Sequence, residues 1–159
     1  RSMRLLLIPA LALALSMPAF AQHVHDAHSQ QGQKLHLNNG KKWRTDAPLR
    51  KGIAGIRAAT VDTIDKVHGG KATDATYDAA AKTVGAQLAG IVQNCKLAPA
   101  ADAQLHLVIS EIMAASEAME GKSKQQSRTD GAVALARALN AYGNHFDDPG
   151  FKPIELEHQ

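Results

Sequence analysis

Residues 73–119 read TDATYDAAAKTVGAQLAGIVQNCKLAPAADAQLHLVISEIMAASEAM, and the fold class follows from this stretch. Apolar residues recur every three or four positions in two series, namely Tyr77, Ala81, Val84, Leu88, Ile91 and Cys95, then Leu105, Val108, Ile109, Ile112, Ala115 and Met119. This spacing predicts two amphipathic helices. Pro99 is tolerated in an opening turn and starts the second helix, while the first should end near Leu97. Because so few residues separate them, the two helices should run antiparallel.

The same spacing continues on both sides of this central hairpin. Upstream, one stripe consists of Leu49, Ile53, Ile56, Thr60, Ile64 and Val67. Downstream, another consists of Val133, Leu135, Ala136, Leu139, Tyr142 and Phe146. Thr45 or Asp46 can cap the upstream helix, and Ser123-Lys124-Gln125-Gln126 has the capping-box pattern for the downstream one.

These segments together predict an all-α protein, an antiparallel up-down-up-down four-helix bundle over residues 45–148. No alternating pattern typical of strands competes with this interpretation. The tail, residues 149–159, is expected to lie over the end of the bundle.

The start of the chain has the three-part pattern of a secretory signal. Arg4 precedes an apolar run, and Ala19-Phe20-Ala21 places small residues where signal peptidase cleaves. We expect residues 1–21 to be a signal cut before Gln22, and we interpret the first two residues as an artefact of the start site. Two prolines interrupt the apolar run, which is also too short for a permanent membrane span.

The exported part of the chain is nearly neutral. Lys and Arg outnumber Asp and Glu by 18 to 15, but Arg1 and Arg4 lie in the expected signal. A near-neutral surface argues against nucleic acid or an anionic membrane as a partner, since either would need a basic face. The chain has one cysteine, which excludes an intramolecular disulfide. Stability must therefore come from helix packing.

A His-containing flexible arm and lead-in, residues 22–44, follows the expected signal. His23, His25, His28 and His36 lie close together in this polar segment. Neutral imidazoles on a flexible chain can converge on Cu²⁺, Ni²⁺ or Zn²⁺. The arm is therefore a candidate metal-binding segment, with a plain soluble tether as the alternative.

The hairpin between the two central helices holds a second candidate metal site. If the chain folds back near residue 100, Cys95 and His106 lie at nearly the same height, and a thiolate with an imidazole suits Cu(I) or Zn²⁺. Met113 could add a thioether, and Asp102 could orient the imidazole ring. The alternative is structural, because a free cysteine is commonly a small buried hydrophobe and His106 could simply cap the seam with a hydrogen bond.

Haem and enzymatic chemistry are not indicated. A c-type haem site needs Cys-x-x-Cys-His, and the two methionines of the exported chain, Met113 and Met119, both fall on the third helix. Cys–His nucleophilic catalysis would need an open cleft and an oxyanion hole, which a tight alanine-rich bundle does not obviously offer. We therefore expect a protein without enzymatic activity.

The chain resembles a loosely defined family of small exported proteobacterial proteins. The resemblance rests on the signal with its His-containing arm, on residues 40–50 (GKKWRTDAPLR) and on residues 95–106 (CKLAPAADAQLH). It implies a periplasmic location and a helical bundle, and no established activity. In architecture the chain is similar to cytochrome c-prime and cytochrome b562, but it lacks their haem ligands.

The leading hypothesis is a periplasmic, non-enzymatic protein that binds or handles a transition metal, with copper favoured. The arm would capture or deliver the ion, and Cys95 and His106 would hold it. One alternative is a structural or partner-binding bundle with incidental histidines, whose partner is an unknown periplasmic protein. A further alternative is a haem or small-ligand carrier. An oligomer is compatible with each of these.

Overall fold

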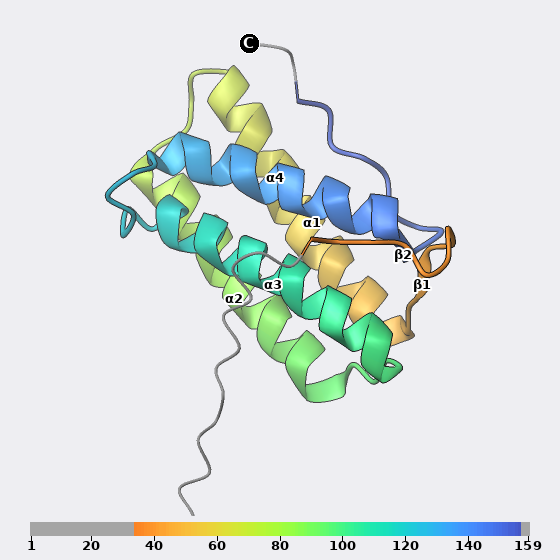
Figure 1. Ribbon diagram of the computed structural model, residues 1–159. Helices are drawn as coiled ribbons and strands as arrows, with labels where there is room; N and C mark the ends of the chain where they lie inside the picture. The colour runs from red at the N-terminus through yellow and green to blue at the C-terminus, as the bar shows by residue number, and fades with distance from the viewer. Residues whose placement is uncertain (1–33, 157–159) are drawn as a thin grey trace, which may run out of the picture.

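Four helices make up most of residues 34–156, the part of the chain that the computed structural model describes (Figure 1). They are α1 (Ala47–His68), α2 (Asp74–Asn94), α3 (Pro99–Met119) and α4 (Arg128–His145). Successive helices run antiparallel, which confirms the predicted all-α four-helix bundle. The expected signal and three arm histidines, His23, His25 and His28, lie outside the described residues. Within residues 34–156, no helix combines the length and apolar character that crossing a bilayer requires.

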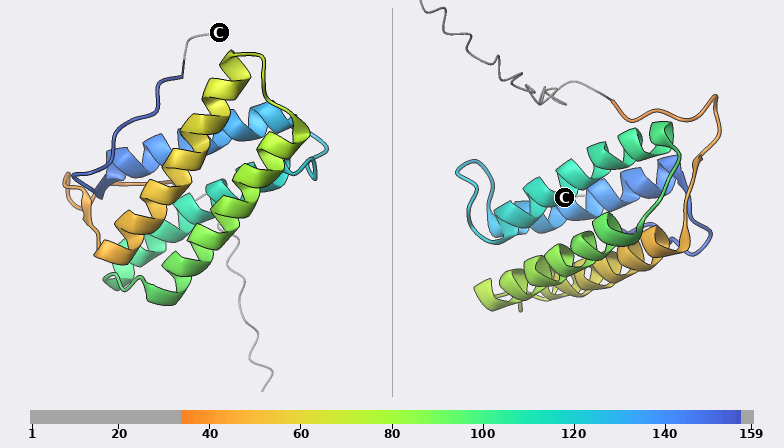
Figure 2. Two further views of the ribbon diagram at one scale, coloured as in Figure 1. Left: turned by 180° about the vertical axis from the view of Figure 1, so that it is seen from behind. Right: turned by 90° about the horizontal axis from the view of Figure 1, so that it is seen from below.

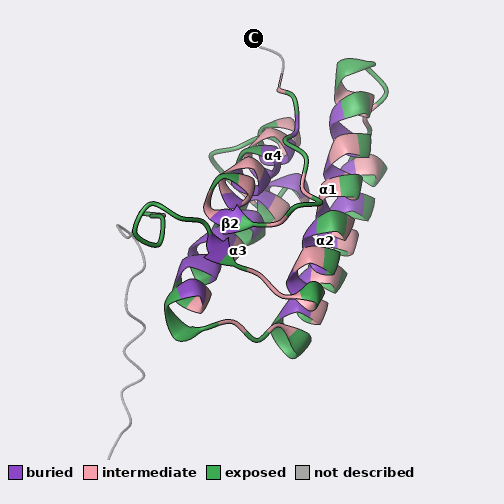
Figure 3. Cartoon of the chain, turned by 90° about the vertical axis from the view of Figure 1, so that its right-hand side faces the viewer, coloured by how far each residue is buried: buried purple, intermediate pink, exposed green. Residues whose placement is uncertain are grey.

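The helices form two hairpins that lie across each other as two layers (Figure 2). α1 packs most extensively on α2, and α3 on α4, while α1 and α2 also contact the other hairpin. Buried residues gather where the two layers face each other (Figure 3). The largest fully buried aliphatic side chains are Leu49, Ile53, Ile56, Ile91, Leu105, Ile112, Met119, Leu135 and Leu139. The apolar stripes read from the sequence therefore form the core.

One glycine in each hairpin allows the two helices of that hairpin to approach closely. A Cβ atom at Gly131 of α4 would lie 2.7 Å from the Met119 backbone nitrogen and 2.9 Å from the Ala115 carbonyl oxygen of α3. A Cβ at Gly52 of α1 would overlap the Ile91 side chain of α2. Only a residue without a side chain fits at Gly131, where the two nearest atoms are backbone atoms, whereas at Gly52 the Ile91 side chain would have to move to admit a Cβ.

The start of α4 differs from the prediction, because the capping box is formed by Ser127 rather than by Ser123. Ser127 Oγ accepts the Asp130 N–H at 3.1 Å, and Asp130 Oδ2 accepts the Ser127 N–H at 2.9 Å. Ser123 Oγ instead accepts the N–H groups of Gln125 and Gln126 and closes a turn. The prediction of a capping box at 123–126 is therefore wrong. Asp130 follows Ser127 by three residues, so the side chain of each accepts the backbone N–H of the other. This reciprocal pair of hydrogen bonds sets the start of the helix.

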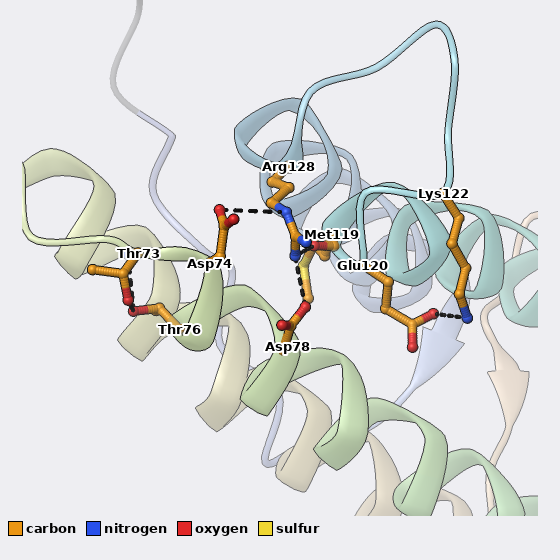
Figure 4. Close-up of polar contacts among 8 residues, drawn as sticks. All are labelled: Thr73, Asp74, Thr76, Asp78, Met119, Glu120, Lys122 and Arg128. Carbon is orange, nitrogen blue, oxygen red and sulfur yellow. Dashed lines mark hydrogen bonds and ion pairs between the residues drawn. The ribbon is translucent and has the colours of Figure 1, made fainter.

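Arg128 joins the ends of three helices (Figure 4). Its Nη1 donates to Asp78 Oδ1 of α2 and to the Met119 carbonyl oxygen of α3, both at 2.6 Å. Its Nε lies 3.5 Å from Asp74 Oδ1. The hydrogen bond to Asp78, together with the charge of Asp74, raises the pKa of this guanidinium above its usual value. The first turn of α4 is thus tied to both α2 and α3.

The lead-in before α1 is held on the bundle by the chain that follows α4. Strand β1 (Trp43–Arg44) pairs in parallel with β2 (Phe146–Asp147), an element that no pattern in the sequence predicted. Trp43 is buried and its Nε1 donates to the His36 carbonyl oxygen at 2.7 Å. The His36 N–H in turn donates to the Gln104 side chain of α3 at 2.9 Å.

The tail after β2 runs along α1 and α4, so the prediction that it covers the bundle end is wrong. The Asn140 side chain of α4 donates to the Ile154 carbonyl oxygen at 2.9 Å and accepts the Ile154 N–H at 2.8 Å. Ile154 itself is buried. A carboxamide can donate and accept at once, so one side chain holds the tail in the manner of a neighbouring strand.

Candidate functional site

Cys95, the first predicted metal ligand, lies just beyond the end of α2. The helix ends at Asn94 rather than near Leu97, and the following Lys96 N–H donates to Asp46 Oδ2 of the α1 cap at 2.7 Å. Burial, and then the charge of Asp46 and a hydrogen bond to it, raises the pKa of the Cys95 thiol to about 12. The thiol is therefore protonated at neutral pH.

Asp46 links the start of α1 to the connection between α2 and α3. As predicted, it caps α1, because its Oδ1 accepts the Leu49 N–H at 2.9 Å. Burial acts to raise the pKa of Asp46, but hydrogen bonds from the Lys96 N–H, the Leu49 N–H and the Cys95 thiol outweigh it and hold the pKa below its usual value. The thiol thus contacts a carboxylate that already has a structural role.

His106 and Met113 lie on exposed parts of α3. His106 Nδ1 is 2.9 Å from the Asp102 carbonyl oxygen and 3.4 Å from Asp102 Oδ2, so Asp102 does neighbour the imidazole as predicted. Met113 is 50% exposed and lines an apolar groove between α2 and α3 that neither Cys95 nor His106 lines. Within residues 34–156, no three His, Cys, Asp or Glu side chains are grouped so as to hold a metal ion.

His36 is the one arm histidine among the described residues. Its ring lies edge-on to Trp43, with ring centroids 5.8 Å apart, and its Nδ1 is 3.2 Å from the Leu37 carbonyl oxygen. The hydrogen bond from the His36 backbone N–H to the Gln104 side chain holds this part of the lead-in against α3. The structure therefore places His36 in the docked lead-in, and its predicted role as a metal ligand stays a prediction.

A concave site opens on another part of the surface, between α1 and the chain that follows α4. We call it the basic groove, and its volume of about 710 Å³ is in the range usual for small-molecule sites. It is lined by Arg44, Thr45, Arg50, Lys51, Ala54, Arg57, Asp147, Asp148, Pro149, Gly150 and Phe151. Its basic side chains outnumber its acidic ones.

The two α1 arginines of the basic groove are held by neutral acceptors. Arg50 Nη1 donates to the carbonyl oxygen and to Oγ1 of Thr45, each at 3.0 Å. Arg57 Nε donates to the Lys152 carbonyl oxygen at 2.5 Å, and its Nη2 is 3.4 Å from the Pro153 carbonyl oxygen. These bonds fix the guanidinium groups without neutralising them. A guanidinium has more N–H donors than these bonds use, so each keeps donors for a ligand.

The two acidic side chains of the groove only partly offset the charge of its four basic ones. Asp148 accepts the Tyr142 hydroxyl at 3.1 Å and the Gly150 N–H at 3.0 Å, so its carboxylate serves the turn after β2. Asp147 lies opposite Arg44 in the β1–β2 register. Between residues 34 and 156, no ion pair includes a basic side chain of the groove. The basic groove therefore presents net positive charge to solvent.

A local excess of basic residues in the sequence corresponds to this groove. Lys and Arg are frequent between residues 41 and 57, where Asp46 is the single acidic residue. The near-neutral balance of the whole chain conceals this local excess. Arg50, Ala54 and Arg57 are also spaced so that they share one face of a helix.

Comparisons of the chain with models of protein families, with curated proteins and with solved structures find no match. The resemblance to small exported proteobacterial proteins thus rests on the sequence features described above.

Proposed function

We propose that this chain is a non-enzymatic periplasmic protein that binds a small anionic ligand in the basic groove. The proposal develops the small-ligand carrier that the sequence left as an alternative. The observation that carries it is the pair Arg50 and Arg57, each fixed by neutral oxygen acceptors and neither in an ion pair with a carboxylate among the described residues. Hydrogen bonds from a guanidinium to an ionised acceptor are among the strongest in proteins. A donor that is already positioned loses less entropy when the ligand binds.

Two features favour a small molecule over a macromolecule as the ligand. The groove has four basic side chains against two acidic ones, whereas the chain as a whole carries only a small excess of basic residues, 18 against 15. Nucleic acids and anionic membranes bind extended basic faces. A groove of about 710 Å³ is instead of the size usual for small organic ligands.

Replacement of Lys51 by Gln tests this proposal directly. Lys51 is exposed and lines the groove, so Lys51→Gln should weaken the binding of inorganic phosphate and octanoate roughly fivefold by removing one charged partner. Isothermal titration calorimetry at low ionic strength measures the change, and added salt should weaken binding to the wild type by screening.

The matched control is Lys82→Gln, which removes the same charge from an exposed position of α2 outside the groove. It should bind both anions as the wild type does. The proposal is wrong if neither phosphate nor octanoate binds the wild type, or if Lys82→Gln weakens binding as much as Lys51→Gln.

Binding of a transition metal, with copper favoured, is a second candidate, and one observation favours it. Asp102 is close enough to Cys95 for its negative charge to raise the pKa of the thiol, and the same Asp102 contacts His106. The charge of Asp102 at the start of α3 thus acts on the thiol, while its side chain lies beside the imidazole. A metal would have to displace the thiol proton, and binding should therefore strengthen as pH rises.

Titration of untagged protein with Cu(I), Cu(II), Ni(II) and Zn(II) tests this second candidate. At least one ion should bind with a dissociation constant below about 10 µM, and Cys95→Ser combined with His106→Gln should weaken it more than about tenfold. His145→Gln is the control, because His145 Nδ1 bonds to the Ala141 carbonyl of its own helix at 2.8 Å, much as His106 does. Binding that survives the double substitution would remove Cys95 and His106 from the site.

A further inference from the structure

We infer, on the basis of the proposed function, that the basic groove selects a dianionic organic ligand, with two acidic groups joined by an apolar spacer. The groove holds two separate guanidinium groups with apolar surface between them, and this arrangement fits such a ligand better than it fits a compact anion. Its elements are the α1 residues Arg50, Ala54 and Arg57 and the ring of Phe151.

The spacing of the two arginines sets the length of the ligand. Arg50 and Arg57 are seven residues apart on α1 and line the same groove. Their Cα atoms are therefore separated by about 10 Å along the helix axis, which is two helical turns. Arg50 is held at Thr45 and Arg57 at the Lys152 carbonyl oxygen, so the two guanidinium groups are fixed at different segments, and we expect a compact anion such as phosphate to contact only one of them. A ligand with two separated acidic groups could contact both.

Both arginines are positioned by hydrogen bonds, and different segments of the chain hold them. Arg50 donates to Thr45, which itself donates from Oγ1 to the Asp147 carbonyl oxygen at 2.6 Å. Arg57 donates to the Lys152 carbonyl oxygen of the tail. Arg50 is thus linked to β2 through Thr45, Arg57 bonds directly to the chain that follows β2, and each keeps unused donors for a ligand. Lys51, next to Arg50, adds a further positive charge at that end.

The middle of the groove is apolar and rigid. Ala54 lies one turn from Arg50 and nearly one turn from Arg57, and Phe151 lines the same groove. The Phe151 ring packs edge-on against Tyr142, with centroids 5.7 Å apart, and a Cβ at Gly143 would overlap it. A fixed ring beside a small side chain offers a surface for methylene groups, so burial of an apolar spacer adds to the affinity.

A series of linear dicarboxylates with four, six, eight and ten carbons, each compared with the monocarboxylate of equal length, tests the inference by calorimetry at low ionic strength. Affinity should pass through a maximum within the series. The best dicarboxylate should bind about tenfold more tightly than its monocarboxylate, because a second charge-assisted contact forms.

Arg57→Gln should abolish this tenfold preference, because the dicarboxylate loses its second guanidinium partner and then binds no more tightly than the monocarboxylate. Arg57 also holds the tail, so Asn140→Ala serves as the control. It removes the two hydrogen bonds to Ile154 and takes no charge from the groove. Asn140→Ala should retain the preference for the dicarboxylate.

The possible outcomes separate this inference from the proposed function. Equal affinities for dicarboxylates and monocarboxylates at every length would overturn the inference and leave the proposed function intact. Loss of the preference in Asn140→Ala would also overturn it, because the tail and not the second guanidinium would then be the cause. If neither carboxylates nor phosphate bind, both are wrong.

Discussion

Replacement of Gly131 by alanine should lower the free energy of unfolding by about 2 kcal/mol, although alanine is the better helix former. The added Cβ would lie 2.7 Å from the Met119 nitrogen and 2.9 Å from the Ala115 carbonyl oxygen. Both are backbone atoms, which cannot rotate away as the end of a side chain could. α3 and α4 would have to separate, and close-packed interiors resist such a shift. Urea unfolding followed by circular dichroism measures the loss.

Gly85→Ala is the matched control, because it makes the same chemical change in a helix without the steric conflict. A Cβ at Gly85 of α2 would meet nothing within 4 Å. This variant should therefore gain about 0.5 to 1 kcal/mol from the lower conformational entropy of the unfolded chain. The two substitutions are expected to have opposite signs. If Gly131→Ala also stabilised the protein, the close approach of α3 and α4 at that position would be wrong.

The fold class could be predicted from the sequence because every helix buries one face. Leu105, Val108 and Ile112 recur at helical spacing, and all three are buried. Pro99 starts α3 as predicted, and Asp46 caps α1. These features depend on residues close together in the chain, which is why the sequence alone reveals them.

Features that depend on distant residues could not be predicted in the same way. Ser123 and Ser127 are both plausible caps when only local sequence is considered. A helix that begins at Arg128 lets this side chain reach Asp78 of α2, a contact that no local pattern contains. The tail is likewise held by a residue distant in the sequence, because Asn140 forms two hydrogen bonds to Ile154. No local sequence pattern predicts this pairing.

The basic groove was missed for a related reason. Its two walls meet because Trp43 pairs with Phe146 across strands of only two residues each, too short to leave an alternating pattern. The predicted metal site relied instead on one short hairpin, Cys95 to His106. For such a hairpin the sequence predicts how far along the helix axes two residues lie, but not the directions in which their side chains point. There the thiol contacts Asp46, the cap residue at the start of α1, which the hairpin alone does not contain.

Tyr142→Ala is expected to have the largest effect on stability, a loss of about 4 kcal/mol in the free energy of unfolding. Tyr142 is fully buried in α4 and stacks on Phe146, with ring centroids 5.1 Å apart. It also packs edge-on against Phe151, so its removal leaves a cavity beneath one wall of the basic groove. Thermal and urea unfolding measure the loss, and weaker binding of octanoate should accompany it.

Tyr142→Phe separates the contribution of the ring from that of the hydroxyl. The hydroxyl donates to Asp148 Oδ2 at 3.1 Å, and burial, followed by the charge of Asp148, raises the pKa of Tyr142 well above its usual value, so the group stays neutral. Loss of this bond should cost only about 1 kcal/mol, since Asp148 keeps the Gly150 N–H as a partner. If Tyr142→Phe were as destabilising as Tyr142→Ala, the hydroxyl and not the stacked ring would hold α4 to the tail. The groove wall would then depend on one hydrogen bond, and octanoate binding should fall equally in both variants.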